Sequence, residues 1–215
     1  MFLGYAAHCA GTGAATDTNG CTTKSLPLGT LVSIQGATRP GRLAYSSWRT
    51  MQLVKERNPD TCAGNDLAFV KVDPVDVKRV NPSVPHWGGP TGLSGGPLAA
   101  TTRVYTYGSS SLRFGVRALS PKTGVSLGTD GGGWTHPVYT ATPGIPGDSG
   151  SALLDARGRA AGVLSTVAVY PRTASNDFSD LARGRYYAAV KGRFAVTLAK
   201  GTVAFDGSKV PVGGL

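Results

Sequence analysis

The sequence has no long hydrophobic segment. No stretch approaches the 18 apolar residues that mark a candidate membrane-spanning helix. Residues 1–7 carry neither the basic region nor the apolar run of a secretory signal peptide. We therefore expect neither a membrane span nor a signal peptide in this chain.

Acidic residues are scarce. The chain has 12 Asp and Glu against 22 Lys and Arg, a formal net charge of +10 at pH 7. Such an excess favours solubility and loose binding to anionic surfaces, such as cell envelopes. No run of five basic residues occurs, and the aromatic residues are not interleaved with basic ones as a single-strand binding platform requires. We expect no specific nucleic-acid binding.

Cysteine is also rare. The three cysteines, Cys9, Cys21 and Cys62, form an odd set, which in a secreted protein suggests that one of them lacks a partner. No second His or Cys stands at zinc-ligand spacing around His8 and Cys9. We expect no metal site and no cofactor.

Glycine, in contrast, is abundant. With 31 glycines and 14 prolines in 215 residues, the composition indicates many turns between short strands. The length is sufficient for one large or two small units with a sizeable core. The sequence therefore predicts an all-β protein.

One glycine-flanked turn carries a candidate nucleophile, Ser149, within Gly147-Asp148-Ser149-Gly150-Ser151. A serine hydroxyl needs an imidazole base, and the imidazole needs a carboxylate that holds its tautomer. His8 and Asp66 supply both types of group. Taken singly, each has a plain structural alternative: a surface turn, a core histidine, an Asp at the start of a strand. Their order along the chain, His then Asp then Ser, is the informative property.

That order is typical of chymotrypsin-type double barrels. Through Ala-Ala-His-Cys (6–9), Asp-Leu-Ala-Phe (66–69) and Gly-Asp-Ser-Gly-Ser (147–151), the chain resembles the chymotrypsin and trypsin-like serine protease family, and most of all its bacterial secreted members. The resemblance implies two antiparallel Greek-key β-barrels and a secreted serine endopeptidase that works through an acyl-enzyme.

The resemblance also implies roles for the residues of the three motifs. His8, Asp66 and Ser149 would be catalytic, and the backbone N–H groups of Gly147 and Ser149 would form the oxyanion hole. Asp148 would be largely buried and would need a counter-charge, for which Arg103, Arg113 and Arg117 are candidates.

For domain organisation, the resemblance implies a first barrel over residues 1–80 that carries His8 and Asp66. A crossing at 81–100 and a second barrel over 101–215 with Ser149 would follow. The family has strands before the histidine. We therefore expect an incomplete first barrel that lacks about two strands, roughly 20 to 30 residues at typical strand lengths.

The hydrophobic pattern predicts individual elements. A short helix is expected from a cap at Ser179 or Asp180 to about residue 191, where Gly192 ends it. Strands are expected at 30–36, 67–72, 103–107, 113–119, 125–127, 138–141, 151–154, 160–169, 194–198 and 202–205. One or two further strands, interrupted near Trp48, are expected at 43–54.

The resemblance further implies a substrate-binding strand at Ser165-Thr166-Val167, with Ser165 also touching the triad carboxylate. The family's Ser-Trp-Gly becomes Ser-Thr-Val here, so a larger side chain replaces the glycine that keeps the specificity pocket open. Pro143 stands where tryptic enzymes have a carboxylate. We therefore expect no preference for Lys or Arg at P1, the residue before the scissile bond, and a small or medium apolar P1 residue instead.

His136 has two interpretations. In the first, it lines the specificity pocket and favours an acidic P1 residue. In the second, which is preferred, it is an ordinary strand or loop residue.

The cysteine after the triad histidine usually bridges in this family to an upstream strand that this chain does not contain. Cys9 then has no partner. The prediction is a disulfide between Cys21 and Cys62, with Cys9 to Cys21 as the alternative.

Three function classes therefore stay open. The leading one is a serine endopeptidase. A non-catalytic protease-like binding domain, or an inactive truncated fragment, is the second. A basic surface-adhesion module, which needs only the charge, is the third.

Overall fold

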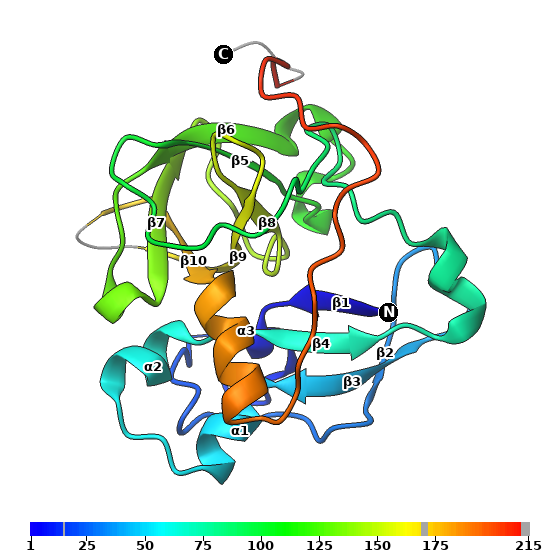
Figure 1. The fold of residues 1–215 in the computed structure, drawn as a ribbon, viewed down its shortest axis with the longest axis vertical. Helices are drawn as coiled ribbons and strands as arrows, with labels where there is room; N and C mark the ends of the chain where they lie inside the picture. The colour runs from blue at the N-terminus through cyan, green and yellow to red at the C-terminus, as the bar shows by residue number, and fades with distance from the viewer. Residues whose placement is uncertain (15, 169–171, 212–215) are drawn as a thin grey trace.

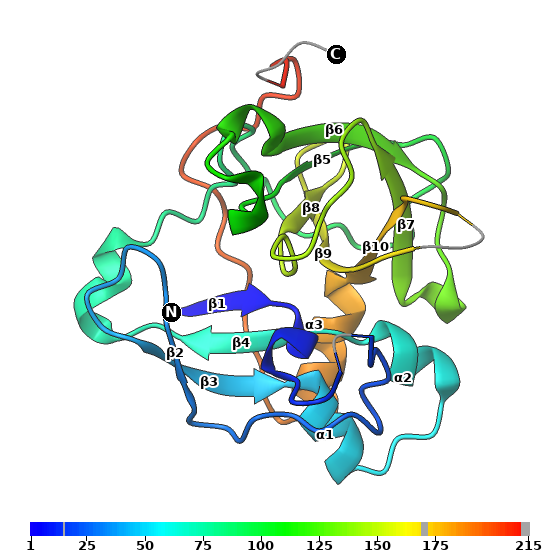
Figure 2. The same cartoon turned by 180° about the vertical axis from the view of Figure 1, so that it is seen from behind.

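The strands form two separate β structures, an open sheet and a closed barrel (Figure 1). This arrangement is taken from a computed structural model, which describes residues 1–14, 16–168 and 172–211. The 180° view shows the same two parts, with helix α3 (Leu181–Val190) running from the barrel toward the sheet (Figure 2). The chain is mostly β, as the sequence predicts.

The open sheet has four antiparallel strands in the order β1-β4-β3-β2. Strands β1 and β2 are its edges, so the sheet does not close into a barrel. Among its strands, β1 lies nearest the closed barrel (Figures 1 and 2). The expectation of an incomplete first barrel is confirmed. The strands are β1 Phe2–Tyr5, β2 Leu31–Val32, β3 Gly41–Ser46 and β4 Ala68–Lys71.

The barrel closes in the antiparallel order β10-β7-β6-β5-β8-β9. Its interior contains an apolar cluster, with Val104, Val138 and Leu153 each 0% exposed. These side chains come from three different strands, so burying them fixes the register of the barrel. The strands are β5 Arg103–Tyr107, β6 Pro121–Ser126, β7 Thr135–Thr140, β8 Ala152–Leu154, β9 Ala160–Val167 and β10 Asn176–Asp180.

Helix α3 confirms the predicted C-terminal helix. The Asp180 side chain accepts a hydrogen bond from the backbone N–H of Arg183 and so caps the helix. The other α-helices are α1 Ser47–Leu53 and α2 Pro59–Gly64. Short 3₁₀ helices are η1 Ala7–Ala10, η2 Pro74–Arg79, η3 Ser111–Arg113, η4 Arg117–Leu119 and η5 Gly131–Gly133. In the described ranges, none of the helices has the length and apolar character needed to cross a membrane.

The segment after α3 corrects the two final predicted strands, 194–198 and 202–205. It runs as an irregular strap from the open sheet past the barrel (Figure 1). Phe194 stacks on Tyr45 and Phe69, with ring centroids 5.3 and 5.7 Å apart. The alternation of apolar residues therefore reflects side-chain packing, because among the described residues no strand forms a hydrogen-bonded ladder with the strap.

The prediction of one or two strands at 43–54, interrupted near Trp48, is also wrong in its second half. Strand β3 ends at Ser46 and helix α1 follows it. Trp48 and Met51, three positions apart, are 2% and 0% exposed, which is the spacing of one helix face. The run of apolar residues was consistent with either element.

The predicted strand 113–119 is two 3₁₀ turns, η3 and η4. Phe114 has φ +49° and Gly115 φ +81°, values in the left-handed region that an extended strand does not contain. The predicted strand 30–36 shrinks to β2. Strand β9 ends at Val167, and residue 169 of its predicted range lies outside the described residues.

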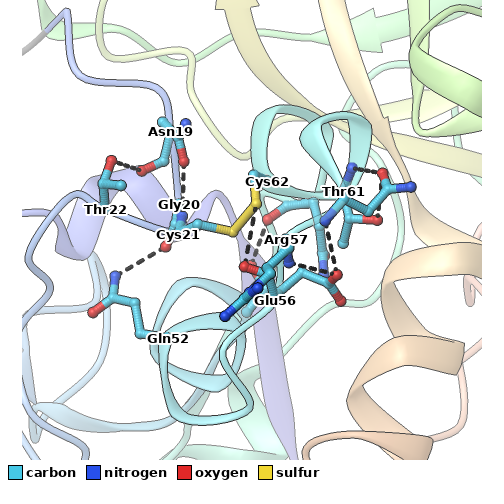
Figure 3. Close-up of a disulfide and its surroundings, with 12 residues drawn as sticks. Asn19, Gly20, Cys21, Thr22, Gln52, Glu56, Arg57, Thr61 and Cys62 are labelled. Atoms are coloured by element: carbon cyan, nitrogen blue, oxygen red, sulfur yellow. Dashed lines mark hydrogen bonds between the residues drawn. A yellow bond between two sulfur atoms is a disulfide. The ribbon is translucent and has the colours of Figure 1, made fainter.

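A disulfide joins Cys21 to Cys62 (Figure 3). It is the first of the two pairings that the sequence leaves open, and Cys9 is free. Beside it, the backbone N–H of Gly20 donates to the carbonyl of Cys62 at 2.9 Å. The bond thus ties the loop after η1 to α2, the two segments that precede β2 and β4.

Removal of this disulfide tests its contribution to stability. The bond closes a loop of 41 residues, for which chain entropy predicts a loss of about 4 kcal/mol in the double variant Cys21→Ala/Cys62→Ala. Urea unfolding of both proteins measures the difference. Cys9→Ala, the matched control, should unfold like the parent protein. Equal stability of the double variant and the parent would contradict the pairing.

Candidate active site

His8 lies in η1, directly after β1. Its neighbours Ala7 and Ala10 are 0% and 2% exposed and anchor the turn in the core. The backbone N–H of His8 donates to Asp66 Oδ1 at 2.7 Å. The position of the ring therefore depends on the same carboxylate that the side chain contacts.

Asp66 follows α2 and precedes β4, and it is 2% exposed. Its Oδ2 lies 2.6 Å from His8 Nδ1 and accepts a hydrogen bond from Ser165 Oγ, also at 2.6 Å. An ionised carboxylate only accepts hydrogen bonds, so Nδ1 carries the proton. The other ring nitrogen, Nε2, is then available as an acceptor in the neutral ring.

Ser149 lies in the turn between β7 and β8, and its Oγ is 2.9 Å from His8 Nε2. The structure thus brings the three predicted residues into one hydrogen-bonded chain, although 141 positions separate His8 from Ser149. In this chain the serine hydroxyl donates to the free nitrogen of the ring.

The environment makes His8 a stronger base. Burial lowers the pKa of the imidazole, but hydrogen bonds with Asp66 and Cys9 and the negative charge of Asp66 outweigh it, so that the net shift of the pKa is upward. The neutral ring, which accepts a proton, becomes more populated as the pH rises.

The turn before Ser149 requires a glycine. Gly147 has φ +93°, and a Cβ at this position would approach Ser110 Oγ to 2.8 Å. The N–H of Asp148 bonds to the carbonyl of Ile145. Within the described residues, the N–H groups of Gly147 and Ser149 have no hydrogen-bond partner, so both are available to a ligand atom.

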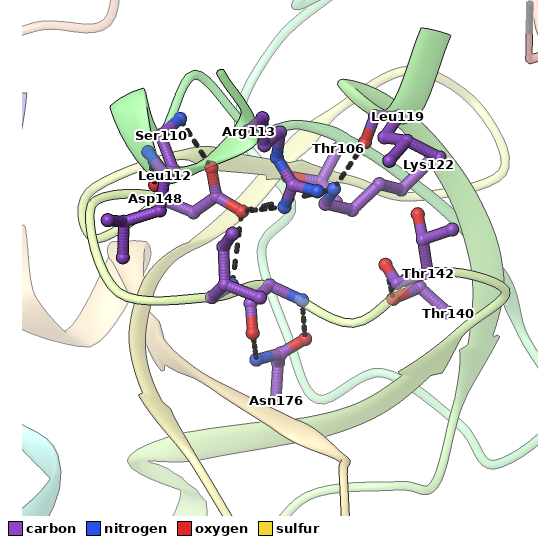
Figure 4. A network of polar contacts seen from close by, with 12 residues as sticks. Thr106, Ser110, Leu112, Arg113, Leu119, Lys122, Thr140, Thr142, Asp148 and Asn176 are labelled. Carbon is purple, nitrogen blue, oxygen red and sulfur yellow. Dashed lines mark hydrogen bonds and ion pairs between the residues drawn. The ribbon is translucent and has the colours of Figure 1, made fainter. Parts of the chain in front are cut away.

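Asp148 is 1% exposed and is held by charge (Figure 4). It accepts hydrogen bonds from the N–H groups of Ser110 at 2.9 Å and Ile145 at 3.1 Å. Its main cationic partner is Arg113, one of the three predicted candidates. Such a carboxylate is stable in the interior only because its charge is paired.

Lys122 is a second cation that sequence reasoning missed. Its side chain is 2% exposed, and Nζ lies 3.9 Å from Asp148 Oδ2 and donates to the carbonyl of Leu119 at 2.8 Å. Burial, and then the charge of Arg113, lower the pKa of Lys122 to about 8, while Asp148 opposes them. A lysine is usually exposed, so only its place inside the barrel reveals the role.

The predicted substrate-binding strand, Ser165–Val167, is the end of β9. One edge of it pairs with β10. On the other edge, β8 pairs only with Ala160–Val163, so in the described part of the chain no strand continues the ladder beside residues 165–167. Hydrogen bonds of Leu164 with the backbone of Gly150 and Ser151 place this free edge next to the turn of Ser149.

Two further residues occupy different surroundings. Pro143 lies half-buried in the loop between β7 and Ser149. His136 is 0% exposed, and its Nε2 lies 2.8 Å from Asp180 Oδ2, so it has the structural role that the sequence favours. The described ranges hold no group of three His, Cys, Asp or Glu residues that could bind a metal ion.

Over most of its length, the chain is similar to solved chymotrypsin-like serine proteases. The M. tuberculosis protease Rv3671c in its active form is 14% identical with a TM-score of 0.48, over 92% of this chain and 82% of that one. A Glu endopeptidase is 15% identical with a TM-score of 0.49, over 87% and 80%. Cellulomonas bogoriensis chymotrypsin is 22% identical with a TM-score of 0.40, over 84% and 79%. No family model and no curated protein matches the sequence significantly.

The buried Lys122 predicts a pH dependence of stability. Its pKa in the folded protein, about 8, lies below its ordinary value of 10.5, so between these values the unfolded chain binds more protons than the folded one. Stability should therefore rise with pH in this window relative to Lys122→Met, by at most about 1.4 kcal/mol per pH unit.

Urea unfolding of both proteins from pH 7.5 to 10 measures the difference, with Lys78→Met at an exposed lysine as the control. A difference between parent and Lys122→Met that stays constant over this range would contradict the assignment.

Proposed function

We propose that this protein is a serine endopeptidase that hydrolyses peptide bonds through an acyl-enzyme. The single observation that carries the proposal is the continuous hydrogen-bonded chain from Ser149 Oγ through the ring of His8 to Asp66. The two free N–H groups of Gly147 and Ser149 support it, because acyl transfer needs donors where the negative charge develops.

In the first half of the reaction, Ser149 Oγ attacks the carbonyl carbon of the scissile bond, and its proton passes to His8 Nε2. Asp66 stabilises the imidazolium, while the N–H groups of Gly147 and Ser149 donate to the oxyanion. The C–N bond then breaks as His8 returns the proton to the leaving amine. The acyl group stays on Ser149.

In the second half, water replaces the amine. His8 Nε2 removes a proton from the water, the resulting hydroxide attacks the ester carbon, and the same two N–H groups receive the second oxyanion. The ester bond breaks and the proton moves from His8 to Ser149 Oγ. The carboxylic acid product leaves, and the starting state is restored.

Peptides fit the free edge of β9 as substrates. An extended chain added beside Ser165–Val167 would continue the antiparallel ladder and present its carbonyl to Ser149. Pro143 offers no negative charge, so no preference for Lys or Arg at P1 is expected. The Cys21–Cys62 disulfide favours an oxidising compartment, and we place the activity outside the cell.

Covalent labelling of Ser149 by a fluorophosphonate tests this function. The probe should modify Ser149 in the parent protein, as identified by peptide mass spectrometry, and should not do so in Ser149→Ala. Peptidase kcat should fall on the order of 10⁶-fold in Ser149→Ala and in His8→Ala. Ser33→Ala removes an exposed serine after β2. This variant should be labelled by the probe and should cleave peptides like the parent.

Folded protein that the probe does not modify, and that cleaves no peptide, would contradict the proposal. That outcome would favour the non-catalytic binding domain instead.

A further inference from the structure

The first residue of β10, Asn176, crosses the space between two segments of the candidate site. Its carboxamide points toward the loop that carries Asp148 (Figure 4). The backbone N–H of Gly144 donates to Asn176 Oδ1 at 2.6 Å, and Asn176 Nδ2 donates to the carbonyl of Gly144 at 3.2 Å. The same Nδ2 lies 3.4 Å from the carbonyl of Thr166. One side chain thus connects the loop before Ser149 with the end of β9.

The carboxamide is fixed and enclosed. Asn176 is 3% exposed, and both of its polar atoms are used in hydrogen bonds within the protein. A Cβ built on Gly144 would lie 2.9 Å from Leu164 Cδ2 and 3.1 Å from Asn176 Nδ2. At Gly144 itself, a methyl group would therefore require movement of Leu164 or Asn176.

The space between the loop and the strand is where a substrate side chain would enter. If a peptide extends along the free edge of β9 with its carbonyl at Ser149, the side chain before the scissile bond is directed between residues 143–147 and 165–167. Both of these segments flank Ser149, since Gly144 is five positions before it and β9 is hydrogen-bonded to the turn at Gly150.

We propose that Asn176 closes the P1 pocket and restricts cleavage to peptide bonds that follow glycine, alanine or serine. This inference rests on the proposed peptidase function and deepens it. A larger P1 side chain would have to displace the carboxamide and leave the N–H and carbonyl of Gly144 without partners. Because unsatisfied buried polar groups are costly, we expect discrimination of about 100-fold or more.

Val167 provides an alternative cause of restriction. Val167 is 45% exposed at the outer end of β9, whereas Asn176, its direct partner on β10, is 3% exposed. The side chain of Val167 would narrow the entrance of the P1 pocket, whereas the carboxamide of Asn176 would fill its interior. The two causes predict different effects of substitution.

A series of peptides that differ only at P1, with Gly, Ala, Leu or Phe, tests the inference through kcat/KM. Active-site titration with a fluorophosphonate normalises each preparation. The parent protein should cleave after Gly and Ala at least about 100-fold faster than after Leu or Phe. Asn176→Gly should raise the Leu to Ala ratio at least about 10-fold, and Val167→Gly should leave that ratio nearly unchanged.

Asn81→Gly, the same substitution at an exposed asparagine outside the candidate site, serves as the matched control, and the preference for small P1 residues should persist in it. If Asn176→Gly does not fold, the ratio in the parent and the ratio in Asn176→Ala, which should change in the same direction as in Asn176→Gly, still decide. Cleavage after Leu or Phe as fast as after Ala in the parent would overturn the inference.

The outcomes separate this inference from the function on which it rests. If the parent protein is labelled at Ser149 and cleaves after large residues, the peptidase function is retained but the proposal of a closed P1 pocket is contradicted. An unchanged ratio in folded Asn176→Gly also contradicts it. A folded parent that neither labels nor cleaves would overturn the peptidase function, and the P1 restriction with it.

Discussion

The carboxylate of Asp66 is the interaction on which the candidate site depends. It accepts hydrogen bonds from the backbone and ring of His8, which follows the open sheet, and from Ser165, which belongs to the barrel. A single buried group thus sets the orientation of the ring and links the two β structures at the point where Ser149 meets His8. Loss of its charge would affect the tautomer of the ring and the alignment of the two parts together.

A second buried carboxylate supports the turn of Ser149. Asp148 lies between the two residues whose N–H groups are free, and its contacts with Ser110, Ile145 and Arg113 fix the path of the backbone there. Lys122 adds a further positive charge to the same buried group. The two N–H groups are therefore held in place by the buried charges beneath the turn, so that under the proposed function they would receive an oxyanion with little rearrangement.

Much of the site could be predicted from the sequence because it depends on motifs. The glycine turn and the order of His8, Asp66 and Ser149 pointed to the fold and to the hydrogen-bonded chain. The need for a counter-charge at Asp148 pointed to three arginines, and the structure selects Arg113 among them. The division of the chain at residues 80 and 100 stays a prediction.

The remaining features depend on contacts between segments that are distant in sequence. Helix α1 has the same apolar residues that a strand would have, and only its packing decides between them. The strap after α3 alternates like a strand, but it pairs with no strand in the described part of the chain. No motif in the sequence marks Lys122 or Asn176, and their roles follow from the barrel that encloses their side chains.

The central claim is that Asp66, through His8, makes Ser149 nucleophilic. The most direct measurement is the pH dependence of the rate at which a fluorophosphonate modifies Ser149. The rate should rise with pH through one titration, since His8 acts in its neutral form. Because Asp66 raises the pKa of His8, Asp66→Asn should move the midpoint to lower pH and slow the rate, on the order of 10⁴-fold. A rate that is independent of pH, or one that Asp66→Asn leaves unchanged, would contradict the account.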